Sequence, residues 1–216
     1  MRVRERAGAV ASAAVAAWHY EDDVLRIREL VVGPLENNVY VVVCARTDKA
    51  VIIDAAAEPD RVEAAVIDVE PIAILTTHGH HDHVGAAVEV RRRLALPFRI
   101  HSADSAAAGI SPDLALEDGE EVAVGELRLG VVHTPGHTPG STCFTLPGHL
   151  FSGDTLFPGG PGATGQPGSS FELIIESIRD RLFTLPDDTL VHPGHGLGTT
   201  VGTERPYLPE WIARGW

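Results

Sequence analysis

The sequence predicts an α/β protein with at least two β-sheets. Short apolar runs rich in β-branched residues alternate with segments of helical periodicity, a pattern typical of chains that mix strands and helices. A length of 216 residues and a hydrophobic content of 44% suit one domain with a sizeable core. We expect this domain over residues 21–216, after an N-terminal extension over residues 1–20.

Buried strands are predicted in the first half of the domain, because four short apolar runs are bounded by polar or turn residues. They cover residues 38–44, 50–54, 72–76 and 98–101. A helix is predicted over residues 59–69, with Pro59 near its first turn, where a missing backbone N–H is tolerated. A second helix is predicted over residues 84–94, and Ser102 could cap a short helix after the last strand.

Two hairpins and a long helix are predicted in the second half. The hairpin strands cover residues 121–124 and 127–132 around Gly125, and residues 141–146 and 150–152 around Pro147 and Gly148. The helix runs from about residue 170 to residue 183, because its apolar positions follow a helical period and Ser169 with Glu172 fits a capping box. A last strand is predicted over residues 189–192, and a short helix or tail over residues 208–216.

The charge balance is acidic, since 30 Asp and Glu oppose 17 Lys and Arg for a formal net charge of -13. This argues against nucleic acid and against an anionic membrane surface as general partners. No apolar stretch approaches the roughly eighteen residues of a transmembrane helix. Cys44 and Cys143 are too few for a disulfide scaffold, and their place in predicted strands favours buried, inert thiols of a cytoplasmic protein.

The two ends of the chain carry weaker signals. Arg2, Arg4 and Arg6 precede an alanine-rich run that faintly resembles a secretion signal, but the run is only weakly hydrophobic, so a loose or helical extension is favoured. The tail around Trp211 and Trp216 is amphipathic. It could pack on the core or cover the subunit interface of a homodimer, and the sequence does not separate these alternatives.

A glycine-rich segment over residues 158–167 matches a dinucleotide-binding fingerprint by letter. Nucleotide binding is not expected, because a proline interrupts the match and no tight strand–turn–helix unit surrounds it. The segment follows Asp154, a candidate site residue, directly. We therefore expect the loop over residues 158–169 to border a substrate pocket.

The chain has eleven histidines, many for its length, and their spacing indicates chemistry. After the predicted strand over residues 72–76 comes the segment T-H-G-H-H-D-H-V-G, with the pattern H-x-H-x-D-H. Histidines two residues apart in an extended loop share a face, so His78 and His80 can bind one ion. Asp82 and His83 lie where the chain turns into the next helix and can reach a second ion.

Three further strand ends carry a histidine or an aspartate. His137 lies in the loop H-T-P-G-H-T-P-G, Asp154 in the segment F-S-G-D-T-L-F, and His195 in the segment V-H-P-G-H-G. Each alone is a weak signal, since a lone strand-end aspartate or histidine is more often a turn or hydrogen-bonding residue. Together with the first motif they place five histidines and two aspartates at strand ends, where active sites of α/β proteins commonly form.

With these motifs the sequence resembles the metallo-β-lactamase superfamily, and most of all its glyoxalase II-like hydrolases. The resemblance covers residues 38–195 and implies a four-layer αβ/βα sandwich of two mixed β-sheets flanked by helices. It further implies that His78, His80 and His137 hold one metal ion, that Asp82, His83 and His195 hold another, and that Asp154 bridges the two. Asp54 matches a family aspartate that supports the site through hydrogen bonds, or it serves only its own loop.

The other histidines are not expected to be ligands. His81 could face solvent or substrate, and His133 could contact a ligand residue or belong to the surface. The remaining ones, His19, His101, His149 and His192, are expected to have no catalytic role.

The implied ligand set of imidazoles and carboxylates suits two divalent metal ions, zinc first, while iron and manganese also fit. A hydroxide bridging the ions, oriented by Asp82 or Asp154 as catalytic residues, would attack a carbonyl. The motifs offer no obvious acid for the departing group, and a thiolate, with a pKa of about 8.5, can leave without one. We therefore expect a small-molecule substrate, a thioester of a small acyl group and a low-molecular-weight thiol.

Departures from family patterns narrow the function. His80 stands where the oxygen-reducing diiron members carry glutamate, and the bridging Asp154 argues against a β-lactamase. The helical domain that carries the basic glutathione-binding residues of glyoxalase II is missing after His195, which argues against glutathione as the thiol carrier. An iron-dependent persulfide dioxygenase, a lactone or ester hydrolase of the same fold, and an inactive metal-binding relative remain as alternatives.

Overall fold

The apolar run NNVYVVVC forms the central strand β3 (Asn37–Cys44) of the computed structural model, which describes residues 16–215. All residues of β3 are buried. Val39 and Val41 belong to a core beneath helices, whereas Tyr40 and Val42 belong to a core between two sheets. Because alternate side chains of a strand face opposite sides, protein covers both faces of β3, and this explains why the run is almost entirely apolar.

The first sheet has the strand order β1-β2-β3-β4-β5-β6. Its other strands are β1 (Tyr20–Glu21), β2 (Leu25–Val32), β4 (Lys49–Ile53), β5 (Glu70–Leu75) and β6 (Phe98–Arg99). Pairing is antiparallel from β1 to β4 and parallel from β4 to β6, so the sheet is mixed. The helices of this half are α1 (Pro59–Ala65), α2 (His81–Val84), α3 (Ala87–Leu94) and α4 (Ser105–Ala108), the last preceded by a 3-10 turn (Ser102–Asp104).

The second sheet has the strand order β14-β13-β10-β9-β8-β7. Its strands are β7 (Glu121–Val124), β8 (Leu127–His133), β9 (Thr142–Leu146), β10 (His149–Gly153), β13 (Leu190–Pro193) and β14 (Thr199–Thr200). Only β10 and β13 pair in parallel. A separate hairpin joins β11 (Leu156–Phe157) to β12 (Gly160–Pro161). The helices are α5 (Phe171–Ser177), α6 (Val201–Glu204) and α7 (Leu208–Arg214), with a 3-10 turn (Arg205–Tyr207) between the last two.

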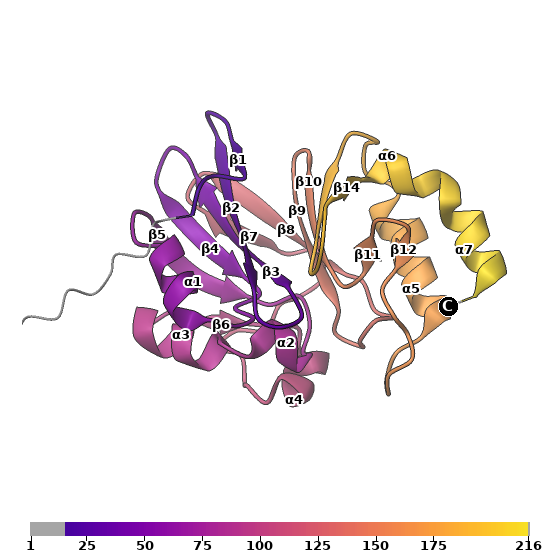
Figure 1. Cartoon of the computed structure of the whole chain (residues 1–216), viewed down its shortest axis with the longest axis horizontal. Helices are drawn as coiled ribbons and strands as arrows, with labels where there is room; N and C mark the ends of the chain where they lie inside the picture. Colours follow the sequence, from indigo (N-terminus) through magenta and orange to yellow (C-terminus); the bar gives the residue numbers. More distant parts are fainter. Residues whose placement is uncertain (1–15, 216) are drawn as a thin grey trace, which may run out of the picture.

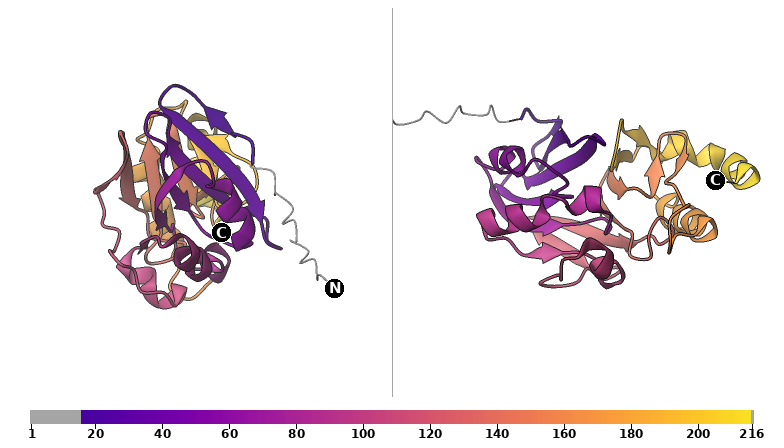
Figure 2. Two further views of the ribbon diagram at one scale, coloured as in Figure 1. Left: turned by 90° about the vertical axis from the view of Figure 1, so that its left-hand side faces the viewer. Right: turned by 60° about the horizontal axis from the view of Figure 1, so that its bottom comes forward.

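The layers follow the order helix, sheet, sheet, helix, with α1 and α3 outside the first sheet and α5 and α7 outside the second (Figures 1 and 2). Three buried clusters fill the interfaces, and the middle one, between the sheets, includes Ile27, Leu75 and Phe144. The predicted sandwich of two mixed sheets flanked by helices is confirmed.

Three predicted helices differ from the structure, and the first of them, predicted over residues 59–69, ends at Ala65 as α1. The helix predicted over residues 84–94 begins only at Ala87, as α3, because the N–H of Ala86 bonds to the carbonyls of Ala55 and Ala56; Val84 ends the separate short helix α2. The helix predicted over residues 170–183 is α for only its first part and continues as a π-helix (Ile178–Leu182). Its cap is Ser170, whose hydroxyl accepts from the N–H of Leu173, and not the predicted Ser169.

The longest strand that the sequence did not predict is β2, with the letters LRIRELVV. Arg28 interrupts its apolar pattern, yet this side chain is 2% exposed. Its guanidinium pairs with Asp68 at 2.6 Å, donates to the carbonyl of Ala65, and lies 3.6 Å from the ring centre of Trp18. A charged residue in the sequence usually indicates an exposed position. Arg28 can be buried because Asp68, which is distant in the sequence, neutralises its charge.

The structure shows part of the predicted N-terminal extension and nearly all of the C-terminal tail. Of the predicted extension over residues 1–20, residues 1–15 lie outside the described part, and the N–H of His19 donates to the carbonyl of Ile27 in β2. In the tail, Trp211 is buried in the core beneath α7. Among residues 16–215, no helix is both long and apolar enough to cross a bilayer.

Candidate metal centre

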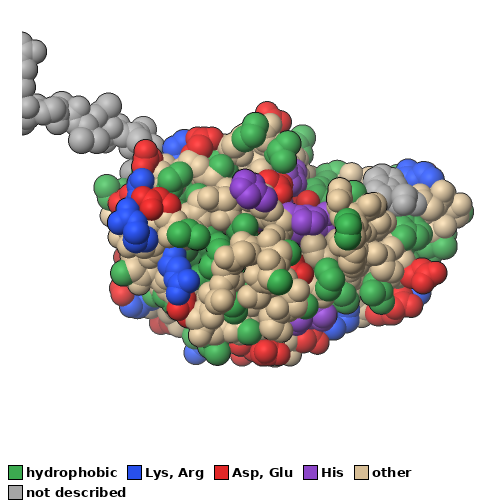
Figure 3. Space-filling view, turned by 90° about the horizontal axis from the view of Figure 1, so that it is seen from below, with side chains coloured by type: hydrophobic (Ala, Val, Ile, Leu, Met, Phe, Trp, Pro, Cys, Tyr) green, Lys and Arg blue, Asp and Glu red, His purple; other side chains and the backbone are tan. Residues whose placement is uncertain are grey.

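Loops at one end of both sheets bring the histidine and aspartate motifs together. The loop after β5 and the helix α2 contribute His78, His80, Asp82 and His83, and the loops after β8, β10 and β13 contribute His137, Asp154 and His195. Two backbone hydrogen bonds join the two halves of the sandwich at this end, from Thr142 N to Thr77 O at 2.8 Å and from Asn38 N to Gly194 O at 2.7 Å. Figure 3 shows this end of the molecule, with histidine and acidic side chains together in the middle of the face.

The first cluster contains His78, His80 and His137. Nδ1 of His80 lies 3.0 Å from Nε2 of His78 and 3.0 Å from Nε2 of His137. The rings meet edge to face, with interplanar angles of 83° and 86°. Three imidazole nitrogens therefore converge on one point.

The second cluster contains Asp82, His83 and His195. Nε2 of His83 lies 3.2 Å from Nε2 of His195, and Oδ2 of Asp82 lies 3.3 Å from Nε2 of His195 and 3.6 Å from Nε2 of His83. His83 is fully buried, whereas Asp82 and His195 are partly exposed. This cluster is therefore the more open of the two.

Asp154 lies between the clusters. Its Oδ1 is 3.4 Å from Nε2 of His83, and its Oδ2 is 3.7 Å from Nε2 of His137 and 3.6 Å from Nε2 of His195. Asp154 also forms a third group of convergent donors with His78 and His83. One carboxylate thus reaches donors of both clusters, in the place that the sequence predicted for a bridge.

The donor geometry fits two metal ions. Four ligands at about 2.05 Å around a tetrahedral zinc ion lie about 3.3 Å from one another, and the contacts within the two clusters run from 3.0 Å to 3.6 Å. Oδ1 of Asp154 is buried without a hydrogen-bond partner among the described residues, a costly state that a cation would relieve. A Cβ at Gly194 would lie 2.2 Å from this oxygen, so the space beside it depends on the glycine.

Hydrogen bonds to the outer ring nitrogens orient four of the five histidines. Nδ1 of His137 lies 2.7 Å from the carbonyl of Ala163, and Nδ1 of His195 lies 2.9 Å from the carbonyl of Leu35. Nδ1 of His78 lies 3.1 Å from Oγ1 of Thr77. Such contacts direct Nε2 inward and fix the tautomer of a metal-binding histidine.

Asp54 supplies the corresponding contact for His83. Its Oδ2 lies 2.9 Å from Nδ1 of His83, and its carboxylate also accepts from the N–H and the hydroxyl of Thr77 at 2.8 Å and 2.7 Å. Asp54 is 1% exposed and has a φ of 57°, which an aspartate tolerates better than most residues do. Asp54 therefore contacts a candidate ligand, His83, and also holds the loop of Thr77 through hydrogen bonds.

The charges in the site shift the pKa values in opposite directions. Burial and then the neighbouring His83 lower the pKa of His78 well below its usual value. Burial also lowers the pKa of His83, but the carboxylates of Asp154 and Asp54 outweigh it and raise that pKa overall. The contact with His195 holds the pKa of Asp82 far below its usual value, and the charge of His83 lowers the pKa of Asp154 against the effect of burial. Both aspartates are therefore ionised at neutral pH.

The sequence did not single out Asn37, which belongs to the site. Its Nδ2 donates to Oδ2 of Asp82 at 2.9 Å and lies 3.3 Å from Nε2 of His195. The residue is 2% exposed, at the first position of β3. An asparagine at the start of a strand carries no distinctive pattern, so only the folded chain reveals this contact.

The remaining histidines lie away from the two clusters. His81 is exposed, and His133 stacks on His101 with ring centres 4.2 Å apart. A separate group forms where His149 stacks on His192, with 3.0 Å between Nδ1 and Nε2.

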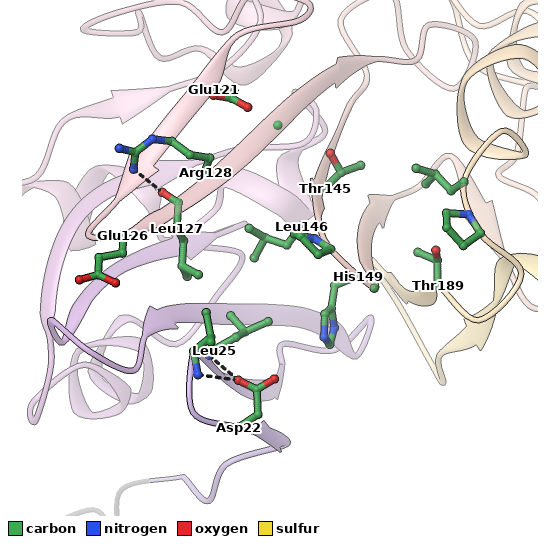
Figure 4. A pocket seen from close by; sticks show the side chains of 16 residues that line it. Asp22, Leu25, Glu121, Glu126, Leu127, Arg128, Thr145, Leu146, His149 and Thr189 are labelled. Atoms are coloured by element: carbon green, nitrogen blue, oxygen red, sulfur yellow. Dashed lines mark hydrogen bonds between the residues drawn. The ribbon is translucent and has the colours of Figure 1, made fainter.

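A groove of about 900 Å³ lies at the opposite end of the sandwich (Figure 4). Leu25, Leu127 and Leu146 line it together with Asp22 and Glu121, beside the turns that join β7 to β8 and β9 to β10. None of the candidate ligands lines this groove. The size of a cavity is therefore no guide to the chemical site in this molecule.

Sequence comparison identifies a family and named relatives. Residues 32–195 match the sequence profile of the metallo-beta-lactamase superfamily. The probable metallo-hydrolase YqgX of Bacillus subtilis is 34% identical over 206 residues, which cover 86% of this chain and 97% of the relative. The probable polyketide biosynthesis zinc-dependent hydrolase BaeB of Bacillus velezensis is 35% identical over 170 residues, covering 77% and 76%. Hydroxyacylglutathione hydrolase GloC of Haemophilus influenzae is 33% identical over 178 residues, covering 72% and 84%.

Solved structures agree with this family. BLEG-1, described as a B3 metallo-beta-lactamase, superposes with a TM-score of 0.76 at 31% identity, covering 85% of this chain and 98% of its own. TTHA1623 in a di-iron-bound form gives a TM-score of 0.70 at 36% identity, covering 82% and 96%. ETHE1 from Myxococcus xanthus gives a TM-score of 0.75 at 30% identity, covering 85% and 83%.

Proposed function

The chain belongs to the metallo-beta-lactamase superfamily, and from this premise we propose that it is a glyoxalase II-like hydrolase that cleaves a thioester of a small acyl group and a low-molecular-weight thiol. The chain is a metal-dependent hydrolase of this superfamily, and its histidine and aspartate clusters suit a dinuclear site. His78, His80 and His137 would hold one ion, Asp82, His83 and His195 would hold the other, and Asp154 would contact both. We propose zinc as the metal, with support from the name of BaeB, while the di-iron form of TTHA1623 makes iron the alternative to test.

The described residues would each have a defined task in this reaction. When bound, two divalent ions would acidify water and polarise the substrate carbonyl. The ionised carboxylates of Asp82 and Asp154 would orient the attacking water by accepting its hydrogen. Asn37 would hold the carboxylate of Asp82 in place for this task through its 2.9 Å hydrogen bond.

One observation carries the choice of a thioester. The lowered pKa values of Asp82 and Asp154 leave both carboxyl groups without a proton at neutral pH. Ionised carboxylates have no proton of their own to give to a departing group, and the inward imidazole nitrogens are the proposed metal ligands. A thiolate, with a pKa of about 8.5, leaves without an acid, whereas an alkoxide or an amide anion is far more basic. The site therefore favours a thiol as the departing group.

Apolar side chains beside the open cluster support an acyl substrate. Leu35, whose carbonyl contacts His195, is 61% exposed, and Leu197, two residues after His195, is 85% exposed. The ring centre of Phe157 lies 6.5 Å from that of His195. Exposed apolar groups next to a polar centre are typical of a binding surface for an apolar substrate part.

A matched substrate panel tests the proposal. Purified zinc-loaded protein is assayed with thioesters of one short acyl group on several small thiols, glutathione included, and with the oxygen ester of the same acyl group. We expect kcat/KM for at least one thioester to exceed that for the oxygen ester by about 100-fold or more, because only the thiolate leaves without an acid. The variant Asp154→Ala, expected to lose metal and activity together, excludes a contaminating esterase.

Three outcomes would overturn the proposal. Hydrolysis of a lactone, or of a β-lactam as the description of BLEG-1 invites, without thioester turnover would show a different hydrolase. Equal rates for thioester and oxygen ester would show that the departing group is not the discriminating feature. Binding of a single iron with oxygen uptake and persulfide turnover would identify the dioxygenase alternative.

A further inference from the structure

A buried carboxylate outside the ligand set contacts both loops of the three-histidine cluster. Asp104 ends the 3-10 turn before α4 and is 1% exposed. Its Oδ2 accepts from the N–H of Gly79 at 2.8 Å and from the hydroxyl of Thr138 at 2.7 Å. Its Oδ1 accepts from the N–H of Gly140 at 2.7 Å.

These donors belong to the two segments that carry the cluster. Gly79 lies between His78 and His80, and Thr138 directly follows His137. The three bonds are short and involve an ionisable acceptor in a buried place, where such bonds are strong. One carboxylate thus fixes the distance between the loop of the first sheet and the loop of the second.

Close packing leaves this carboxylate little freedom. A Cβ at Gly79 would lie 2.6 Å from the carbonyl oxygen of Asp104, and a Cβ at Gly140 would lie 2.6 Å from its Cγ. The network continues to Ser141, whose hydroxyl lies 2.7 Å from that of Thr138. Both glycines allow an approach that a larger residue would prevent, so the arrangement is specific to these residues.

We propose that Asp104 is a positioning residue for the ion at His78, His80 and His137. The inference rests on the ligand assignment of the proposed function. Asp104 touches no candidate ligand side chain, and it acts by holding the backbone of Gly79 and Gly140 and the hydroxyl of Thr138. Asp54 performs a comparable task for the other cluster, through its contacts with His83 and Thr77. Asp54 also reaches His78 through the hydroxyl of Thr77, whereas the contacts of Asp104 lie only in the segments around the three-histidine cluster.

The variant Asp104→Asn keeps the shape of the side chain and turns one acceptor oxygen into a donor. At least one of the three bonds is then lost, because an amide group cannot accept at its nitrogen. Glu204→Gln is a matched control, since Glu204 is 3% exposed and also accepts from a glycine N–H and a threonine hydroxyl, those of Gly159 and Thr199. Thr138→Val is a milder variant that removes only one donor.

Zinc titration in single-cluster backgrounds tests the inference. Metal-free protein competes with a chromophoric chelator for Zn²⁺, in the background His195→Ala, which weakens the open cluster, and in the background His80→Ala, which weakens the three-histidine cluster. We expect Asp104→Asn to weaken zinc binding about 10- to 100-fold in the first background and less than about 3-fold in the second. Glu204→Gln should change neither value, and Thr138→Val should give a smaller loss in the first background only.

A second readout needs no metal. In amide NMR spectra of the metal-free protein, the Gly79 and Gly140 resonances should move upfield in Asp104→Asn while most others keep their positions. Equal weakening in both backgrounds would show general destabilisation, and unchanged affinity in both would show that Asp104 serves only its loop; either result overturns the inference. Failure of the wild type to bind two zinc ions would instead count against the proposed function.

Discussion

Gly194 offers a sharp probe of the metal site, because it makes room for Asp154. Its φ lies outside the left-handed region, so an alanine can adopt the same backbone conformation. The added Cβ would lie 2.2 Å from Oδ1 of Asp154 and 2.7 Å from Cε1 of His83. Ordinary contact begins at 3.4 Å, so the carboxylate must retreat by about 1.2 Å, the difference between these two distances.

This displacement is large on the scale of metal coordination. Zinc–ligand distances tolerate deviations of about 0.2 Å, so Gly194→Ala should remove Asp154 from the ligand set. If zinc affinity falls about 100-fold, the stabilisation by bound metal falls by about 2.7 kcal/mol. At about 2–4 °C per kcal/mol for a chain of this size, the zinc-induced rise in Tm should shrink by about 5–11 °C.

The assay compares melting curves with zinc and with a chelator for three proteins: the wild type, Gly194→Ala and the control Gly165→Ala. A Cβ at Gly165 meets nothing within 4 Å, and this glycine also lacks a positive φ, so the control should behave as the wild type does. A full zinc-induced rise in Gly194→Ala, with wild-type affinity, would refute the reasoning. It would mean that the oxygen next to Gly194 is not where a metal ion binds.

Three further predictions concern residues around the site and in the core. Asn37→Ala should weaken zinc binding about 10-fold, because Asp82 loses its 2.9 Å hydrogen bond; unchanged affinity in chelator competition would remove Asn37 from the site. Leu197→Ser should lower kcat/KM for longer acyl thioesters about 10-fold and spare the acetyl thioester; equal effects on both would show that Leu197 does not contact the acyl chain. Burial and the neighbouring His149 lower the pKa of His192 to about 3 in the folded chain, whereas the pKa of an unfolded histidine is about 6.5. Between these two pH values the unfolded chain binds a proton at His192 and the folded chain does not, so acid favours unfolding. The free energy of unfolding of the metal-free protein should therefore fall by about 2 kcal/mol between pH 7 and pH 5 through this group, and urea titration of His192→Asn should show a correspondingly shallower pH dependence.

Strands that are buried on both faces of the sheet could be predicted from the sequence. β3 and the second half of β5 are buried, so their letters are mostly apolar, and the bounds of both strands were predicted to within two residues. β2 escaped prediction because Arg28 is buried against Asp68 and Trp18, partners that only the folded chain supplies. The break between α2 and α3 was not predicted for a similar reason. The N–H of Ala86 donates to the carbonyls of Ala55 and Ala56, which follow β4 and are distant in the sequence.

In the site, too, residues with a local sequence motif could be predicted, and residues whose partners are distant in the sequence could not. The local motif around His78 and the strand-end positions of His137, Asp154 and His195 could be read from the letters, because each motif places its side chain through its own turn. Asn37 and Asp104 could not be predicted, because their partners lie in distant parts of the sequence. A residue that acts by connecting two segments has no local signature.

Metal affinity and the packing of the two sheets belong to one equilibrium in this molecule. The donors of each cluster come from loops of both halves, as His80 and His137 show for the three-histidine cluster and His83 and His195 for the open cluster. Oδ1 of Asp154 is buried without a hydrogen-bond partner among the described residues, a cost that a bound cation would relieve. We therefore expect a change that loosens the contact between the sheets to weaken metal binding, even where it touches no ligand, and bound metal to stabilise that contact in turn.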